Sequence, residues 1–146
     1  MFTNDARAPN VRAVGYSDYE RYKWETLAHL FHRFGIDGAW IEVRQVAPGD
    51  VQTQAALVGR VVRELLDEGL VFGAFASRDD GYNLGDDEFV PVPREVVEAE
   101  LARPLDYVAP EDHLLWLIPT QRAEEVWQSL PPEAYLDPRS AKQAGS

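Results

Sequence analysis

Asp50–Ala76 reads DVQTQAALVGRVVRELLDEGLVFGAFA, and this stretch decides the fold. Apolar residues recur every three or four positions between Val58 and Leu66, which predicts an amphipathic helix over 51–68. Asp50 is a good N-cap for that helix, and Gly69 is a residue type that ends one. A short apolar strand is expected at 70–76. The stretch therefore predicts a helix that passes the chain directly into a strand.

The chain before Asp50 predicts further helical structure. Residues 17–20 read SDYE, the form of a capping box, and the helix that they begin is expected over 18–34, with Gly35 as its stop. Residues 36–47 fit either a short helix or an alternating strand, and we favour the helix.

The chain after the strand mixes turn signals with short apolar runs. Residues 77–81, SRDDG, predict a turn, because Asp-Gly pairs favour positive φ. Residues 89–92 suggest a short return strand or an extended segment, and a helix is expected at 94–102. Residues 113–118, HLLWLI, predict a buried strand, and Thr120 is the expected cap of a last helix.

These elements predict a single α+β domain over 17–136, with a loose lead-in at 1–16 and a flexible tail at 137–146. A chain of 146 residues is long enough for an apolar core without staples. The lack of cysteine excludes disulfides, thiol catalysis and thiolate metal sites. Neither a secretory signal nor an apolar run of roughly 18 residues is present, so we expect no membrane segment and a cytoplasmic location.

The charge is concentrated in one segment. The whole chain has a net charge of −11, and residues 79–112 hold 11 acidic residues against Arg94 and Arg103, a net −9. A field of that sign repels phosphate backbones and attracts basic surfaces. The simplest interpretation is a solvated face, and the more specific one is a binding surface.

Few residues indicate chemistry. No serine lies in G-x-S-x-G, and neither G-x-G-x-x-G nor a Walker A lysine occurs, so we expect no enzyme and no cofactor. His29 and His32 are spaced i, i+3, and His113 or a carboxylate would complete a zinc site with them. That pair lacks the H-E-x-x-H pattern, and we interpret these histidines as structural, with no metal. The oxygen-rich loop at 79–88 meets the EF-hand requirement in neither register.

The order of the elements resembles the winged helix-turn-helix class. Residues 61–71, VVRELLDEGLV, look like the exit of a recognition helix into a wing strand, and residues 116–120, WLIPT, look like the second wing strand. The resemblance implies a winged-helix-like domain with a small antiparallel sheet, in which a helix-containing acidic insertion separates the wing strands. The chain also resembles small acidic proteins of high-GC bacteria, including immunity-type proteins.

Two functions follow as hypotheses, and the sequence leaves the oligomeric state open. The first is a non-enzymatic protein-binding module, of an immunity or inhibitor type, whose acidic surface binds a basic partner protein. Its candidate residues are Asp79, Asp80, Tyr82, Asp86, Asp87, Glu88 and Phe89, the two aromatic residues serving as anchors. The alternative is a winged-helix DNA-binding transcriptional regulator. Its candidate residues are Gln52, Gln54, Arg60 and Arg63. Acidic residues on the same helix disfavour this alternative.

Overall fold

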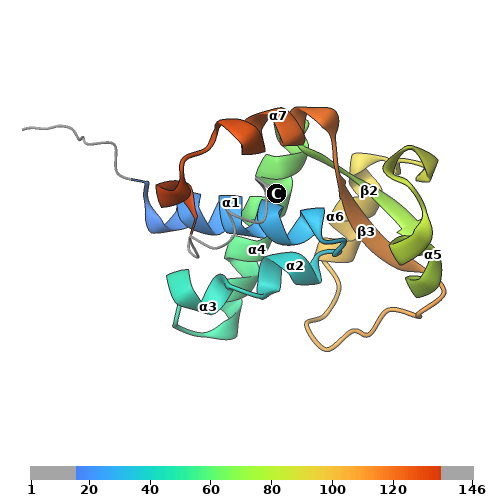
Figure 1. The fold of residues 1–146 in the computed structure, drawn as a ribbon. Helices are drawn as coiled ribbons and strands as arrows, with labels where there is room; N and C mark the ends of the chain where they lie inside the picture. The colour runs from blue at the N-terminus through green and yellow to red at the C-terminus, as the bar shows by residue number, and fades with distance from the viewer. Residues whose placement is uncertain (1–15, 136–146) are drawn as a thin grey trace, which may run out of the picture.

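A computed structural model describes residues 16–135, in which helices pack against a two-stranded antiparallel sheet (Figure 1). The predicted α+β class is confirmed. The elements are α1 Asp18–Phe31, α2 Asp37–Trp40, α3 Val43–Val46, α4 Val51–Asp67, β2 Val71–Ala76, α5 Arg78–Asn83, η2 Asp86–Glu88, α6 Arg94–Leu101, β3 Leu114–Pro119, α7 Gln121–Ser129 and η3 Pro132–Ala134. Apart from residue 16, the expected lead-in and tail lie outside the described residues. No helix in the described part is long and apolar enough to cross a membrane.

Helix α1 begins as predicted but ends earlier. The Ser17 hydroxyl accepts from the Glu20 N–H at 3.1 Å, and the Glu20 carboxylate accepts from the Ser17 N–H, so the capping box forms. Gly35 is not the stop. The helix ends at Phe31 and Arg33 takes the left-handed conformation, with φ 73°. Gly35 forms an isolated antiparallel bridge with Trp116 instead, where the Leu115 carbonyl leaves no room for a Cβ.

The favoured helical interpretation of residues 36–47 is confirmed, although the segment forms two short helices and not one. Helices α2 and α3 are separated by Ile41 and Glu42. The Tyr22 hydroxyl donates to the Ala39 carbonyl and so ties α2 to α1. Burial raises the pKa of Tyr22, so this phenol stays a neutral donor at physiological pH.

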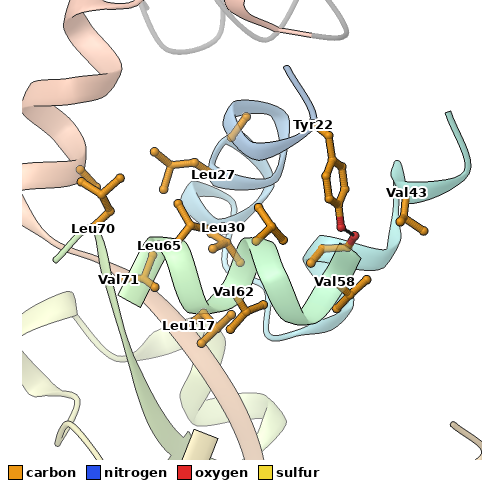
Figure 2. Packing of buried hydrophobic residues seen from close by; sticks show 14 of the residues in the cluster. Tyr22, Leu27, Leu30, Val43, Val58, Val62, Leu65, Leu70, Val71 and Leu117 are labelled. Carbon is orange, nitrogen blue, oxygen red and sulfur yellow. Dashed lines mark hydrogen bonds between the residues drawn. The ribbon is translucent and has the colours of Figure 1, made fainter. Parts of the chain in front are cut away.

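Helix α4 has the predicted caps and forms the centre of the core. The Asp50 carboxylate accepts from the Thr53 N–H at 2.9 Å, and Gly69 follows the helix with φ 71°, a conformation that glycine adopts without strain. Figure 2 shows Leu65 and Val62 of this helix packed near Leu30 of α1. These three side chains are at most 1% exposed.

The sheet pairs β2 with β3 from Val71 opposite Pro119 to Ala76 opposite Leu114. Most of β3 is buried on both faces, because alternate residues enter two different clusters. Leu115 and Leu117 join the large cluster with α1 and α4, whereas Trp116 and Ile118 join a smaller cluster with Phe89. The second cluster fixes the segment after β2 on the outer face of the sheet.

The expected turn at 77–81 is wrong, because these residues form the start of helix α5. The Ser77 hydroxyl accepts from the Asp80 N–H at 3.1 Å, an N-cap bond that the turn interpretation overlooked. Gly81 does not take a positive φ. It is buried against the indole of Trp116, where a Cβ would lie 2.7 Å from Cη2 and closer still to two other ring atoms.

The remaining elements follow the sequence closely. Residues 89–92 form an extended segment without a strand, and the Val92 N–H donates to the Gly73 carbonyl at 2.8 Å. Helix α6 begins after Pro93 and buries Val97. The Thr120 hydroxyl accepts from the Ala123 N–H, so the expected cap of α7 is confirmed.

Candidate functional site

The acidic residues that follow β2 lie in two consecutive short elements, α5 and η2. We define the acidic surface as Asp79, Asp80, Tyr82, Asp86, Asp87 and Glu88, all of which are exposed. Asp79 and Asp80 occupy the first turn of α5, where negative charge is favourable. The Gly85 N–H donates to Glu88 Oε1 at 2.7 Å and closes η2. Short helical elements therefore hold these carboxylates on the surface.

Tyr82 gives the acidic surface an aromatic group. Its side chain is 56% exposed, and its ring meets the edge of the Trp116 indole at a centroid distance of 5.3 Å. Trp116 is itself held by its Nε1–H, which donates to the Ala76 carbonyl at 3.2 Å. The phenol therefore stands on a rigid support.

Phe89 does not belong to this surface, although the sequence suggested it as a second anchor. It is 6% exposed and packs in the smaller cluster on the outer face of the sheet. The Arg33 guanidinium lies over its ring at 5.0 Å and also donates to Asp86 at 2.9 Å. Phe89 therefore contributes to the core, and Asp86 is the one carboxylate of the acidic surface with a described ion pair.

The four residues considered for DNA binding are not gathered on one free face of α4. Gln52 is exposed, but Gln54 is 9% exposed and its amide donates to the Ala47 carbonyl at 3.0 Å. Arg60 lies over the Tyr19 ring and pairs with Glu64, and Arg63 pairs with Glu98 of α6 at 2.9 Å.

Helix α6 forms ion pairs with α4. The hydrogen bond from Arg63 is the main cause that lowers the pKa of Glu98, and Arg94 of α6 pairs in turn with Asp67. Because α6 belongs to the segment between the two strands, this segment neutralises Arg63 of α4, and it also neutralises Asp67. A basic face of the kind that contacts phosphates is absent from the described part of α4.

His29 and His113 lie in separate packing environments. His29 of α1 contacts the edge of Phe34 and lies 3.9 Å from Glu25 and Glu42, whereas His113 stacks on Phe75 at a centroid distance of 4.0 Å. Among residues 16–135, no three histidine, aspartate or glutamate side chains form a group that would hold a metal ion.

Tyr82 also lines a cleft of about 510 Å³, which no pattern in the sequence predicted. Its walls come from five separate segments: residues 33–40, α4 between Val51 and Val58, residues 100–109, α5 at Arg78 and Tyr82, and the start of β3. Figure 1 shows the long connection after α6 that supplies the third of these walls. We refer to this space as the cleft.

Comparison of the chain with protein-family models, curated proteins and solved structures found no match. The function therefore has to be inferred from the residues and their arrangement.

Proposed function

We propose that this chain is a non-enzymatic protein-binding module on a winged-helix-like scaffold, and that it binds a basic partner protein as an immunity or inhibitor-type protein would. The observation that carries the proposal is the acidic surface itself. Five exposed carboxylates and a half-exposed tyrosine lie within residues 79–88, in a capped helix and the 3-10 turn that follows it.

The scaffold part of the proposal rests on element order and pairing. Helix α1, the pair α2 and α3, and helix α4 precede two antiparallel strands, and the bridge between Gly35 and Trp116 adds a short second pairing. This is the order expected of a winged helix. The segment between β2 and β3 is far longer than a hairpin, and it contains α5, η2 and α6.

Electrostatics explains how such a surface would select its partner. A group of exposed negative charges raises the rate at which the surface encounters a basic protein, although each exposed ion pair adds little affinity. The Tyr82 ring would supply the desolvated contact, because tyrosine offers a large rigid area at low entropic cost. Association is therefore expected to be fast and sensitive to salt.

The test compares two triple variants in a pull-down from the source cells. The surface variant is Asp79→Asn, Asp80→Asn and Asp87→Asn; the control is Glu124→Gln, Glu125→Gln and Glu133→Gln. Both remove three negative charges from exposed positions, but only the first touches the acidic surface. We expect the wild-type chain and the control to retain the same basic protein, released at about 0.5 M salt, and the surface variant to lose it.

Tyr82→Ala provides a second, uncharged change on the same surface. We expect it to speed dissociation of the retained protein and to leave the salt dependence of association unchanged, because it removes contact area and no charge. Retention of an acidic or neutral protein, or equal retention by the surface variant, would contradict the proposal.

A DNA-binding regulator is the alternative, and the winged-helix-like order of the elements is the observation in its favour. A gel shift with pooled genomic fragments at about 50 mM salt tests it, because low salt favours any phosphate contact. Retardation that Arg60→Gln abolishes would support DNA binding. No retardation under these conditions would exclude this alternative.

A further inference from the structure

The cleft has the size and lining of a small-molecule site. Its volume of about 510 Å³ falls within the range of roughly 300–1,000 Å³ that ligand pockets occupy. Most of its lining is apolar, and aromatic side chains lie on several walls. Those that matter most here are Phe34, Trp40, Tyr107 and Trp116. Flat apolar walls of this kind favour a ring-bearing or branched apolar body.

The charged groups of the cleft have the opposite balance to the rest of the protein. Three arginines line it, Arg33, Arg78 and Arg103, against the two carboxylates of Asp37 and Glu100. Each arginine also has an ion pair, Arg33 with Asp86, Arg78 with Glu111 and Arg103 with Glu100, and the first two of these partners lie outside the lining. The chain as a whole has 25 acidic and 14 basic residues, so a net positive lining is unusual here. Opposite charge in a concave, partly apolar site attracts an anion more strongly than the same charge on an open surface.

Arg78 and Arg103 have N–H donors that are not used in hydrogen bonds within the described residues. The Arg103 Nε–H donates to the Glu100 carboxylate at 2.8 Å, and the Arg103 guanidinium stacks on the Tyr107 ring. The Nε atom of Arg78 lies 3.5 Å from the Glu111 carboxylate. A guanidinium has five N–H donors, and within residues 16–135 no hydrogen bond from the terminal nitrogens of these two arginines is recorded. Two side chains of the lining can therefore still donate hydrogen bonds to an anionic group.

Arg33 lines the cleft and has two features with a free-energy cost, while its Nη2 donates to Asp86 and its guanidinium lies over Phe89. Its Nη1 is buried and has no hydrogen-bond partner among the described residues, and its backbone has φ 73°, which is uncommon for a residue with a Cβ. An unpaired buried donor and a strained backbone each have a free-energy cost, and such features concentrate at binding sites. The cost at Arg33 falls on a residue that lines the cleft.

We propose that the cleft binds a small organic anion that combines an aromatic or branched apolar body with one carboxylate or sulfonate group. The apolar body would lie against the aromatic walls, and the anionic group would accept hydrogen bonds from the arginines. This site shares Tyr82 with the acidic surface and is joined to it by the Arg33–Asp86 ion pair, but it favours an anion where that surface favours cations, and it does not depend on the proposed partner.

Two fluorescent probes that differ in one charged group test the proposal. The anion is 8-anilinonaphthalene-1-sulfonate, and N-phenyl-1-naphthylamine has the same rings without the sulfonate. We titrate each into the full chain, exciting the probe and not tryptophan. The sulfonate is expected to bind at one saturable site, about tenfold or more tighter than the neutral probe, which corresponds to at least one good charge-assisted contact.

Two neighbouring alanines of α4 provide a matched pair of variants. Ala55 lines the cleft and is half-buried, whereas Ala56 is exposed and lies outside the lining. Ala55→Trp should fill the cleft and weaken the sulfonate probe about tenfold or more, and Ala56→Trp should leave its affinity unchanged. Circular dichroism and thermal unfolding show whether each variant is folded.

Arg103→Gln keeps the proposal testable if Ala55→Trp does not fold, because it changes one exposed side chain at the rim. It should weaken the sulfonate probe several-fold and leave the neutral probe unaffected. Three results would each overturn the proposal: no saturable binding of the sulfonate, equal affinity of the two probes, or full affinity in a folded Ala55→Trp variant.

Discussion

Gly81 is the residue at which α5 touches the sheet, and this contact leaves no room for a side chain. Trp116 cannot move aside easily, since it is 4% exposed and its Nε1–H is bonded to Ala76. We predict that Gly81→Ala lowers the free energy of unfolding by about 1–3 kcal/mol through overpacking, measured by urea denaturation.

Gly49→Ala is the matched control, because nothing lies within 4 Å of a Cβ at that position. Its free energy of unfolding should stay equal or rise slightly, as alanine restricts the unfolded chain. If both substitutions lower the free energy of unfolding by similar amounts, the contact with Trp116 does not limit the size of the side chain at position 81.

Glu64 links stability to pH at the residue scale. Burial acts to raise its pKa, but the hydrogen bond from Arg60, the nearby Tyr19 hydroxyl and the Lys23 charge outweigh burial and lower the pKa below its usual value. The ionised form is therefore favoured in the folded state, so its stabilising contribution is complete above the unfolded pKa and is lost as the pH falls through the folded pKa.

We predict that Glu64→Gln makes unfolding less dependent on pH below about pH 5, where the wild-type chain loses this contribution. Urea unfolding at a series of pH values measures the difference between the two proteins. Asp50 and Glu98, whose pKa values are also lowered, are present in both and cancel in the comparison. Parallel pH profiles would contradict the assignment.

At the element scale, Thr120 joins three parts of the fold at the start of α7. Its hydroxyl accepts from the Ala123 N–H at 3.2 Å and donates to the Gly69 carbonyl at 2.7 Å, next to the residue that ends α4. We predict that Thr120→Ala lowers the free energy of unfolding by about 1–2 kcal/mol, because both bonds are lost together.

Thr120→Ser keeps the hydroxyl and provides the control for this prediction. It should recover most of the lost stability in the same thermal or urea unfolding experiment, since serine is also a strong N-cap. If serine destabilises the protein as much as alanine does, the methyl group and not the hydrogen bonds accounts for the effect.

At the scale of the whole molecule, sequence reasoning succeeded where the signal is local. Helix α4 is a regular apolar stripe with a capping aspartate and a glycine stop, so its bounds were predicted to within a residue. It failed at Ser77 to Gly81, where the same residues suit a tight turn and a capped helix. The choice is made by Trp116, which lies 35 positions further along the chain and packs on Gly81.

The candidate sites divide in the same way. The exposure of the five carboxylates of the acidic surface could be expected from their charge. The burial of Phe89 depends on the smaller cluster on the outer face of the sheet. The cleft could not be predicted at all, because its arginines come from three separate segments that only the fold brings together. The sequence likewise contains no sign of the positive φ at Arg33, which is usually a glycine conformation.

The net charge of −11 predicts how the Tm of the whole folded chain depends on salt. Raising the salt from about 0.01 M to about 0.1 M shortens the screening length from about 30 Å to about 10 Å. The ion pairs of Lys23 with Glu68 and of Arg63 with Glu98 have separations of 2.6 and 2.9 Å and are screened little. Repulsion among distant acidic residues is screened first, so the Tm should rise by about 2–5 °C. The rise should be smaller for the variant Asp79→Asn, Asp80→Asn and Asp87→Asn, and a Tm that falls with salt would mean that ion pairs outweigh the repulsion.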